Sequence, residues 1–121
     1  MDNERISEGE WKVMNVIWDK EPVPAKVVTE EIETLYGWKA NTTYTVLTRL
    51  IEKGVIDRKY PKYTISSLVS REEMRNREIE YMLTRMFDGS RKAMFSAFLG
   101  SEELSDEEIK EIKALLKKSE K

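Results

Sequence analysis

Three capping boxes constrain the fold of this chain more than any other feature of its sequence. Ser7, Ser70 and Ser105 are each followed three residues later by glutamate, and an apolar pair with the spacing of a hydrophobic staple flanks each box. In a capping box, the serine side chain accepts the backbone N–H of the glutamate, and the glutamate side chain accepts that of the serine. The pattern therefore predicts that three helices begin just after these serines.

The hydrophobic pattern and the breaker residues extend this prediction to six helices and one hairpin. Apolar residues recur at helical spacing, and Pro24, Gly37 and Gly54 interrupt them. After Gly54 the composition changes to strand formers around a Pro61-Lys62 turn. The predicted helices cover residues 8–20, 24–36, 41–53, 71–87, 91–99 and 106–118, and the predicted strands cover residues 55–60 and 63–66.

This order of elements predicts a mainly α fold with a small β-hairpin. Three helices followed by a hairpin indicate a winged helix-turn-helix domain, which we assign to residues 1–68. The helices within residues 69–121 carry apolar stripes that are too narrow to be buried within that segment, so a second copy of the chain is expected to cover them. The predicted contacts of this helical dimerisation domain are Ile79, Met82, Leu83, Met86, Met94, Phe98, Ile109, Ile112 and Leu116.

The predicted helix over residues 41–53 is unusual because it contains four threonines, which are poor helix formers. Projected at about 100° per residue, its apolar side chains gather on one side and its polar side chains on the other. In a DNA major groove, threonine offers a hydroxyl to base edges and a methyl to the thymine C5 methyl. The alternative is a poorly optimised surface helix. The predicted base-reading residues are Asn41, Thr42, Tyr44, Thr45, Thr48 and Arg49.

Basic residues concentrate around the same helix and the hairpin. Residues 39–63 contain six basic and two acidic side chains, a local charge of +4, whereas the whole chain has a net charge of −2. A basic face on an acidic protein is the pattern expected for contact with DNA phosphates. Basic side chains also face solvent in many proteins, or guard sheet edges against aggregation. The predicted phosphate contacts are Lys39, Lys53, Arg58, Lys59 and Lys62.

The missing residue types exclude several kinds of chemistry. The chain has no cysteine and no histidine, so it lacks thiol nucleophiles, thiolate metal ligands and the commonest general base. We therefore expect no enzymatic activity, no bound metal and no cofactor. The sequence has neither an apolar run long enough to insert into a membrane nor a signal peptide. We expect a soluble, cytoplasmic protein.

Two motifs resemble the penicillinase repressors of the BlaI/MecI/CopY family. The first is Glu-Trp-x-Val-Met followed by Ile-Trp, within residues 10–18. The second, W-x-x-x-T-x-x-T-x-L-x-R-L-x-x-K-G-x-I, covers residues 38–56, and the tail from Met86 is similar as well. The resemblance spans nearly the whole chain. It implies a winged-helix transcriptional repressor that binds, as a homodimer, to a palindrome in double-stranded DNA built on TACA and TGTA.

The resemblance also bears on how such a repressor is released from DNA. In the β-lactam-response branch, a membrane sensor-protease pathway leads to cleavage of an Asn-Phe bond in the fifth helix. The matching bond here is Ala97-Phe98, in which alanine replaces the asparagine. The copper branch uses a cysteine motif, which this chain lacks.

A second hypothesis is a winged helix that binds another protein through its threonine face, without sequence-specific DNA binding.

Overall fold

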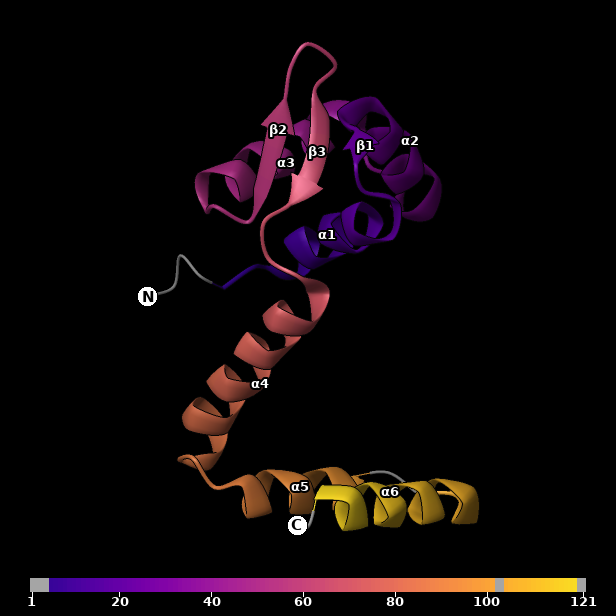
Figure 1. Ribbon diagram of the computed structural model, residues 1–121, viewed down its shortest axis with the longest axis vertical. Helices are drawn as coiled ribbons and strands as arrows, with labels where there is room; N and C mark the ends of the chain where they lie inside the picture. The colour runs from indigo at the N-terminus through magenta and orange to yellow at the C-terminus, as the bar shows by residue number, and fades with distance from the viewer. Residues whose placement is uncertain (1–4, 102–103, 120–121) are drawn as a thin grey trace. The chain divides into compact units, whose positions relative to one another are not determined.

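A computed structural model describes residues 5–101 and 104–119 of the chain. These residues form six helices and a small antiparallel sheet (Figure 1). The chain divides into two compact units, unit 1 over Met1–Glu78 and unit 2 over Ile79–Lys121. The helices are α1 (Glu8–Lys20), α2 (Ala25–Tyr36), α3 (Ala40–Glu52), α4 (Arg71–Phe87), α5 (Arg91–Ser101) and α6 (Asp106–Ser119), and the strands are β1 (Val23–Pro24), β2 (Ile56–Lys59) and β3 (Thr64–Ser67).

The predicted fold class is confirmed, and the capping boxes explain why the helices begin where they do. At α1 the Glu10 N–H donates to Ser7 Oγ at 3.1 Å, and the Ser7 N–H donates to Glu10 Oε1 at 2.7 Å. The same reciprocal pair forms at α6 between Ser105 and Glu108, with both distances 3.0 Å. Each such cap contributes about 1 kcal/mol to helix stability.

The other two helices of the C-terminal half begin with a simpler cap. At α4, Ser70 Oγ accepts the Glu73 N–H at 3.0 Å, while the Glu73 carboxylate pairs with Arg77 at 3.6 Å. At α5, Ser90 Oγ accepts the Ala93 N–H at 3.0 Å. The Ser90 cap is not visible as a capping box in the sequence, because alanine rather than glutamate stands three residues later.

The sheet contains one strand more than the sequence predicts. The predicted hairpin is present as β2 and β3, joined by residues 60–63, and β1 pairs with the other side of β3 to give the order β1-β3-β2. In this pairing Val23 lies opposite Ile65. A strand of two residues has no detectable alternation, and Pro24 lacks a backbone N–H, so the sequence reads here only as a break before α2. Pro24 itself is the N-cap of α2 rather than part of its first turn.

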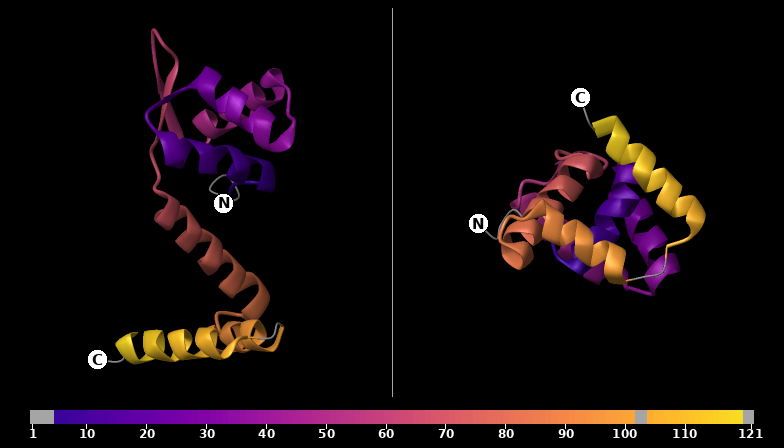
Figure 2. Two further views of the ribbon diagram at one scale, coloured as in Figure 1. Left: turned by 90° about the vertical axis from the view of Figure 1, so that its right-hand side faces the viewer. Right: turned by 90° about the horizontal axis from the view of Figure 1, so that it is seen from below.

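Unit 1 has its own hydrophobic core between the first three helices and the sheet. Met14 and Ile17 of α1, Ile32 of α2, Leu47 of α3 and Ile65 of β3 are fully buried there. Burial of a side chain of this size contributes about 1.5–3 kcal/mol. The core therefore holds α3, which lies among the other elements of unit 1 (Figures 1 and 2), by its apolar side. The opposite side of α3 is exposed.

The hairpin is joined to the helices through the main chain as well. The Ala25 N–H, at the start of α2, donates to the Tyr63 carbonyl at 2.9 Å, and Pro24 supplies no side-chain cap there. Tyr63 adopts a φ of 47°, in the left-handed region that non-glycine residues rarely enter. The Tyr63 carbonyl thus accepts a hydrogen bond at the N-terminal end of α2, for which no side-chain cap is described.

Unit 2 lacks a comparable core. Among its described residues, Leu83 is the one hydrophobic side chain that is fully buried, and α6 buries none. Its helices α5 and α6 lie at an angle to each other (Figure 2), and with Leu104 they line an apolar groove of about 190 Å³. The division between the units lies within α4, beyond the predicted domain boundary at residue 68, because the first turns of α4 pack on unit 1 through the buried Met74.

Candidate nucleic-acid interface

The two sides of α3 differ as the helical projection predicts. Thr43, Val46, Leu47 and Leu50 are buried against the core of unit 1. Tyr44 is half-buried at the border between the two sides. The polar side chains that the projection placed on the outer side are all exposed, namely Asn41, Thr42, Thr45, Thr48 and Arg49.

Two of the three threonines on the exposed side, Thr45 and Thr48, satisfy their hydroxyl hydrogens within α3. Thr45 Oγ1 donates to the Asn41 carbonyl and Thr48 Oγ1 donates to the Tyr44 carbonyl, each at 3.0 Å. This bond to the preceding turn fixes the side-chain rotamer, so the methyl and the remaining lone pair of the oxygen are held in one orientation. The exposed side of α3 therefore offers methyl groups and hydrogen-bond acceptors in a rigid array.

The beginning of α3 differs by one residue from the predicted arrangement. Lys39 is the N-cap, and its carbonyl accepts the Thr42 N–H at 3.0 Å and the Thr43 N–H at 3.3 Å, while its side chain forms no capping bond. Asn41 lies inside the helix and is not its cap. Its exposed amide is consequently carried on the same rigid helix as the threonines.

The hairpin carries an aromatic cluster that the sequence reasoning missed. The rings of Tyr44 and Tyr63 are 5.8 Å apart, and those of Tyr60 and Tyr63 are 5.9 Å apart. The Arg58 guanidinium lies 5.3 Å from the Tyr60 ring centre and 5.4 Å from that of Tyr63. A hydrogen bond with the Tyr63 side chain, and then the electrostatic interaction with Tyr60, raise the pKa of Arg58 above its ordinary value. The cluster connects α3 to the hairpin and holds a permanent positive charge beside it.

Four of the five predicted phosphate contacts lie at the surface near α3 and the hairpin. Lys39 precedes α3, Arg58 and Lys59 lie on β2, and Lys62 lies in the hairpin turn, and all four are exposed. Long basic side chains around an exposed helix are the arrangement that commonly positions a protein on the phosphate backbone.

Lys53 differs from the other four. Its Nζ donates to Glu10 Oε1 at 2.7 Å and to the Arg5 carbonyl at 3.0 Å, and its side chain is 25% exposed. Glu10 is 2% exposed. Burial alone would raise the pKa of Glu10, but the hydrogen bonds and charge supplied by Lys53 and Ser7 outweigh it, and the pKa is lowered. This ammonium neutralises a buried carboxylate, and the phosphate contact of Lys53 stays a prediction.

The residues predicted to form the dimer interface are mostly uncovered in unit 2. Met82, Met94 and Ile112 are half-buried. Leu83 is the exception, because it already packs within its own chain. The predicted cleavage bond, Ala97-Phe98, lies within α5, and both residues are exposed. The remaining predicted contacts are exposed as well, and they are Ile79, Met86, Phe98, Ile109 and Leu116.

Three further large hydrophobic side chains are exposed on α5 and α6 and were not predicted as dimer contacts. They are Phe95 and Leu99, which line the apolar groove, and Leu115. Among residues 5–101 and 104–119, no three acidic side chains lie close enough together to hold a metal ion. No helix in the same part of the chain is both long and apolar enough to cross a membrane.

Comparison with known proteins gives matches along nearly the whole chain. A family profile described as Penicillinase repressor matches residues 6–118. The methicillin resistance regulatory protein MecI of Staphylococcus aureus is 34% identical over 122 residues, which covers 98% of this chain and 99% of that protein. The penicillinase repressor of Staphylococcus aureus is 32% identical over 113 residues, covering 92% of this chain and 90% of that protein.

The fold of unit 1 is similar to a solved structure. The solution structure of the DNA-binding domain of the repressor BlaI matches with a TM-score of 0.52 and 26% identity. The match covers 58% of this chain and 88% of that domain.

Proposed function

We propose, from the premise that this chain belongs to the penicillinase repressor family, that it binds a palindromic operator as a homodimer. Members of this family are DNA-binding transcriptional repressors, and the chain is accordingly a DNA-binding transcriptional repressor and not an enzyme. The operator is proposed to contain TACA and TGTA half-sites, one for each copy of unit 1. The repressor is proposed to act in the cytoplasm.

The observation that most supports the proposal is the exposed array of methyl groups and hydrogen-bond acceptors on α3. The methyl groups of Thr45 and Thr48 suit the C5 methyl of thymine, and their oxygens suit the amino groups of adenine and cytosine. Arg49, one residue further along, has the geometry for the guanine edge opposite cytosine. These groups match the bases that occur in TACA and TGTA.

The exposed basic side chains are proposed to position α3 on the duplex. Lys39 lies at the start of α3 and would contact the phosphate backbone there, while Lys59 and Lys62 extend the contact from the hairpin. Arg58 is held by Tyr60 and Tyr63, so little side-chain entropy is lost when it binds a phosphate. The second hypothesis, a winged helix that binds another protein, would leave this concentration of charge without a role.

The proposal of a dimer is supported by the small number of buried hydrophobic side chains in the described part of unit 2. The described residues of unit 2 bury one hydrophobic side chain, and burial on this scale cannot balance the entropy of ordering its helices. A two-fold related copy would cover the exposed side chains of α5 and α6, and would also match the symmetry of a palindromic operator.

The base-reading role of α3 is tested by substitution. Thr45→Ala and Arg49→Ala are each expected to weaken binding to the operator by about 1–3 kcal/mol and to relax specificity at one base pair of each half-site. Thr45→Val should retain part of the affinity, because it keeps the methyl group and loses the oxygen. Titration of each variant with operators substituted at single base pairs measures both effects. Unaltered operator affinity in the two alanine variants would exclude this assignment.

Lys59→Ala provides the matched control. A phosphate contact carries no sequence information, so this variant should bind operator and random DNA more weakly by the same factor. The slope of log affinity against log salt should fall by about one. If binding of the unmodified chain to duplex DNA does not depend on salt, the protein-binding hypothesis is favoured instead.

Release from DNA is proposed to follow cleavage of α5 at Ala97-Phe98, at the end of a membrane sensor-protease pathway. Contacts between two copies would cover this bond, and a covered helical bond is cut only after local opening. On treatment of host cells with a β-lactam, an immunoblot should then reveal a fragment that ends at or near Ala97. Derepression with only full-length protein on the blot would contradict cleavage.

A further inference from the structure

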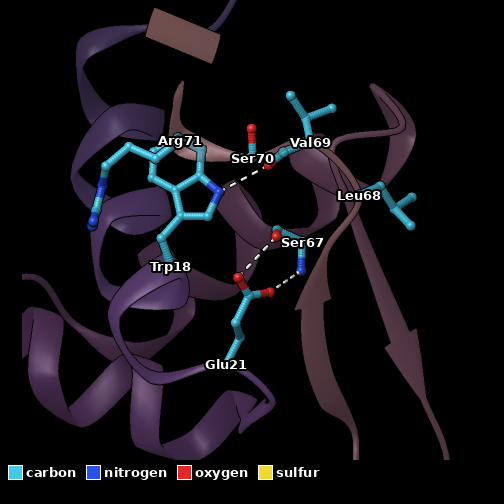
Figure 3. Close-up of a pocket in the computed structure, with 7 residues that line it drawn as sticks. All are labelled: Trp18, Glu21, Ser67, Leu68, Val69, Ser70 and Arg71. Carbon is cyan, nitrogen blue, oxygen red and sulfur yellow. Dashed lines mark hydrogen bonds between the residues drawn. The ribbon is translucent and has the colours of Figure 1, made fainter. Parts of the chain in front are cut away.

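The joint between β3 and α4 is held on α1 by side-chain hydrogen bonds (Figure 3). The Glu21 carboxylate accepts the Ser67 N–H at 2.6 Å and the Ser67 hydroxyl at 3.0 Å. Trp18 Nε1 donates to the Val69 carbonyl at 2.9 Å. These groups line a shallow pocket of about 410 Å³, but their hydrogen bonds are directed at one another. The side chains that line the pocket therefore hold the segment between β3 and α4 on α1.

The first turn of α4 is held on the same helix. Arg71 Nη2 donates to Asp19 Oδ1 at 2.8 Å and to the Asn15 carbonyl at 3.2 Å. The Arg71 guanidinium also lies 5.3 Å from the centre of the Trp18 ring. One turn further, the Met74 side chain is fully buried in the core of unit 1. The beginning of α4 is thus fixed by a charge, a stacked ring and an apolar contact.

The next turns of α4 are held by the segment that precedes α1. Arg5 forms a bidentate ion pair with Glu78, with Nε to Oε2 at 3.0 Å and Nη2 to Oε1 at 2.8 Å. The Arg5 carbonyl accepts a hydrogen bond from Lys53, at the end of α3. Arg5 is therefore anchored by its main chain on one side while its side chain holds α4 on the other.

We propose that Arg5 and Arg71 are positioning residues that restrict the half-site spacing which the repressor accepts. The inference rests on the proposed function, in which two copies bind the two halves of a palindrome. Arg71 and Glu78 are seven residues apart in α4, which is about 10 Å along the helix axis. Two attachments at this separation oppose tilting of the helix, whereas a single attachment would act as a pivot.

The energies of these ion pairs support a positioning role. A partly exposed ion pair contributes little net stability, so Arg5 and Arg71 add little to the folding of unit 1. Their effect on a two-site interaction is larger, because avidity is lost when the connection cannot reach both sites. Each added base pair moves one half-site by about 3.4 Å and rotates it by roughly 35° about the duplex. A helix α4 whose first turns are fixed on unit 1 tolerates such a change poorly.

The test compares operators whose half-sites are one or two base pairs closer together or further apart than the optimum. The unmodified chain should lose about 100-fold in affinity for a change of one base pair, and the double variant with Arg5→Ala and Arg71→Ala should lose about tenfold or less. Arg77→Ala is the matched control, since Arg77 has a similar exposure and, among residues 5–101 and 104–119, forms its ion pair with Glu73 of the same helix. It should keep the steep dependence. All three proteins should bind an isolated half-site equally.

A charge exchange, Arg5→Glu with Glu78→Arg, should restore the steep dependence that Arg5→Ala weakens. The inference is overturned if the double variant binds the palindrome with an unchanged spacing profile, or if Arg77→Ala flattens the profile as much. It is also overturned if the double variant binds the isolated half-site more weakly, since that result indicates damage to unit 1. An unmodified chain that binds the palindrome no more tightly than one half-site would contradict the dimeric function and this inference together.

Discussion

Replacement of Leu116 by glutamate is expected to make the chain monomeric at micromolar concentration and to weaken binding to the palindromic operator by about 100-fold or more. Leu116 is 49% exposed on α6, beside the apolar groove of unit 2. In a dimer, a carboxylate at this position would be buried without a partner, which costs several kcal/mol. Affinity for an isolated half-site should not change, because α3 is untouched.

Leu35→Glu is the matched control for this prediction. Leu35 is 53% exposed, but it lies on α2 in unit 1 and is not one of the proposed dimer contacts. This variant should remain dimeric in sedimentation equilibrium. A monomeric unmodified chain, or a Leu116→Glu variant that is still a dimer at the same concentration, would show that the proposed interface is wrong.

Lys53→Met is expected to lower the free energy of unfolding of unit 1 by about 2–4 kcal/mol at neutral pH. The substitution preserves the length of the side chain, but it leaves the buried Glu10 carboxylate without its cation and removes the hydrogen bond to the Arg5 carbonyl. Urea unfolding at a fixed protein concentration measures the change. Lys12→Met is a suitable control, because the half-buried Lys12 lies over the Tyr36 ring at 4.8 Å and should contribute less than about 1 kcal/mol.

The pH dependence of this difference follows from the lowered pKa of Glu10. A carboxyl group whose pKa is lowered by folding stabilises the folded state above its unfolded pKa, and the contribution is lost as the pH falls through its folded pKa. The difference between the unmodified chain and Lys53→Met should therefore be full at neutral pH and should shrink in acid. A difference that does not vary with pH would indicate that Lys53 acts only through packing.

The helices and their orientation could be predicted because their signals are local. A capping box is complete within four residues, and the exposed side of α3 follows from the helical period alone. The buried Leu47 and Leu50 and the exposed Thr45 and Arg49 thus lie as the projection predicts. Whether these exposed residues read bases stays a prediction, because exposure does not identify a partner.

The rest of the site depends on contacts between residues that are far apart in the sequence. Lys53 belongs to the basic segment by composition, yet its partner Glu10 is 43 positions away, and no periodicity links the two. The Tyr44–Tyr63 contact joins α3 to the hairpin in the same way. Strand β1 escaped prediction because its register is determined by β3 and not by its own two residues. Such pairings appear only when the chain is folded.

The hydrogen bond from the Ala25 N–H to the Tyr63 carbonyl determines where this fold can absorb a change of length. A residue inserted beside Pro61 would lengthen only the exposed turn. A residue inserted after Tyr63 would shift the β2–β3 register by one position, turn Ile65 out of the core and move the carbonyl away from the start of α2. The length of the hairpin can therefore be tuned at its tip, while its base must keep a constant length.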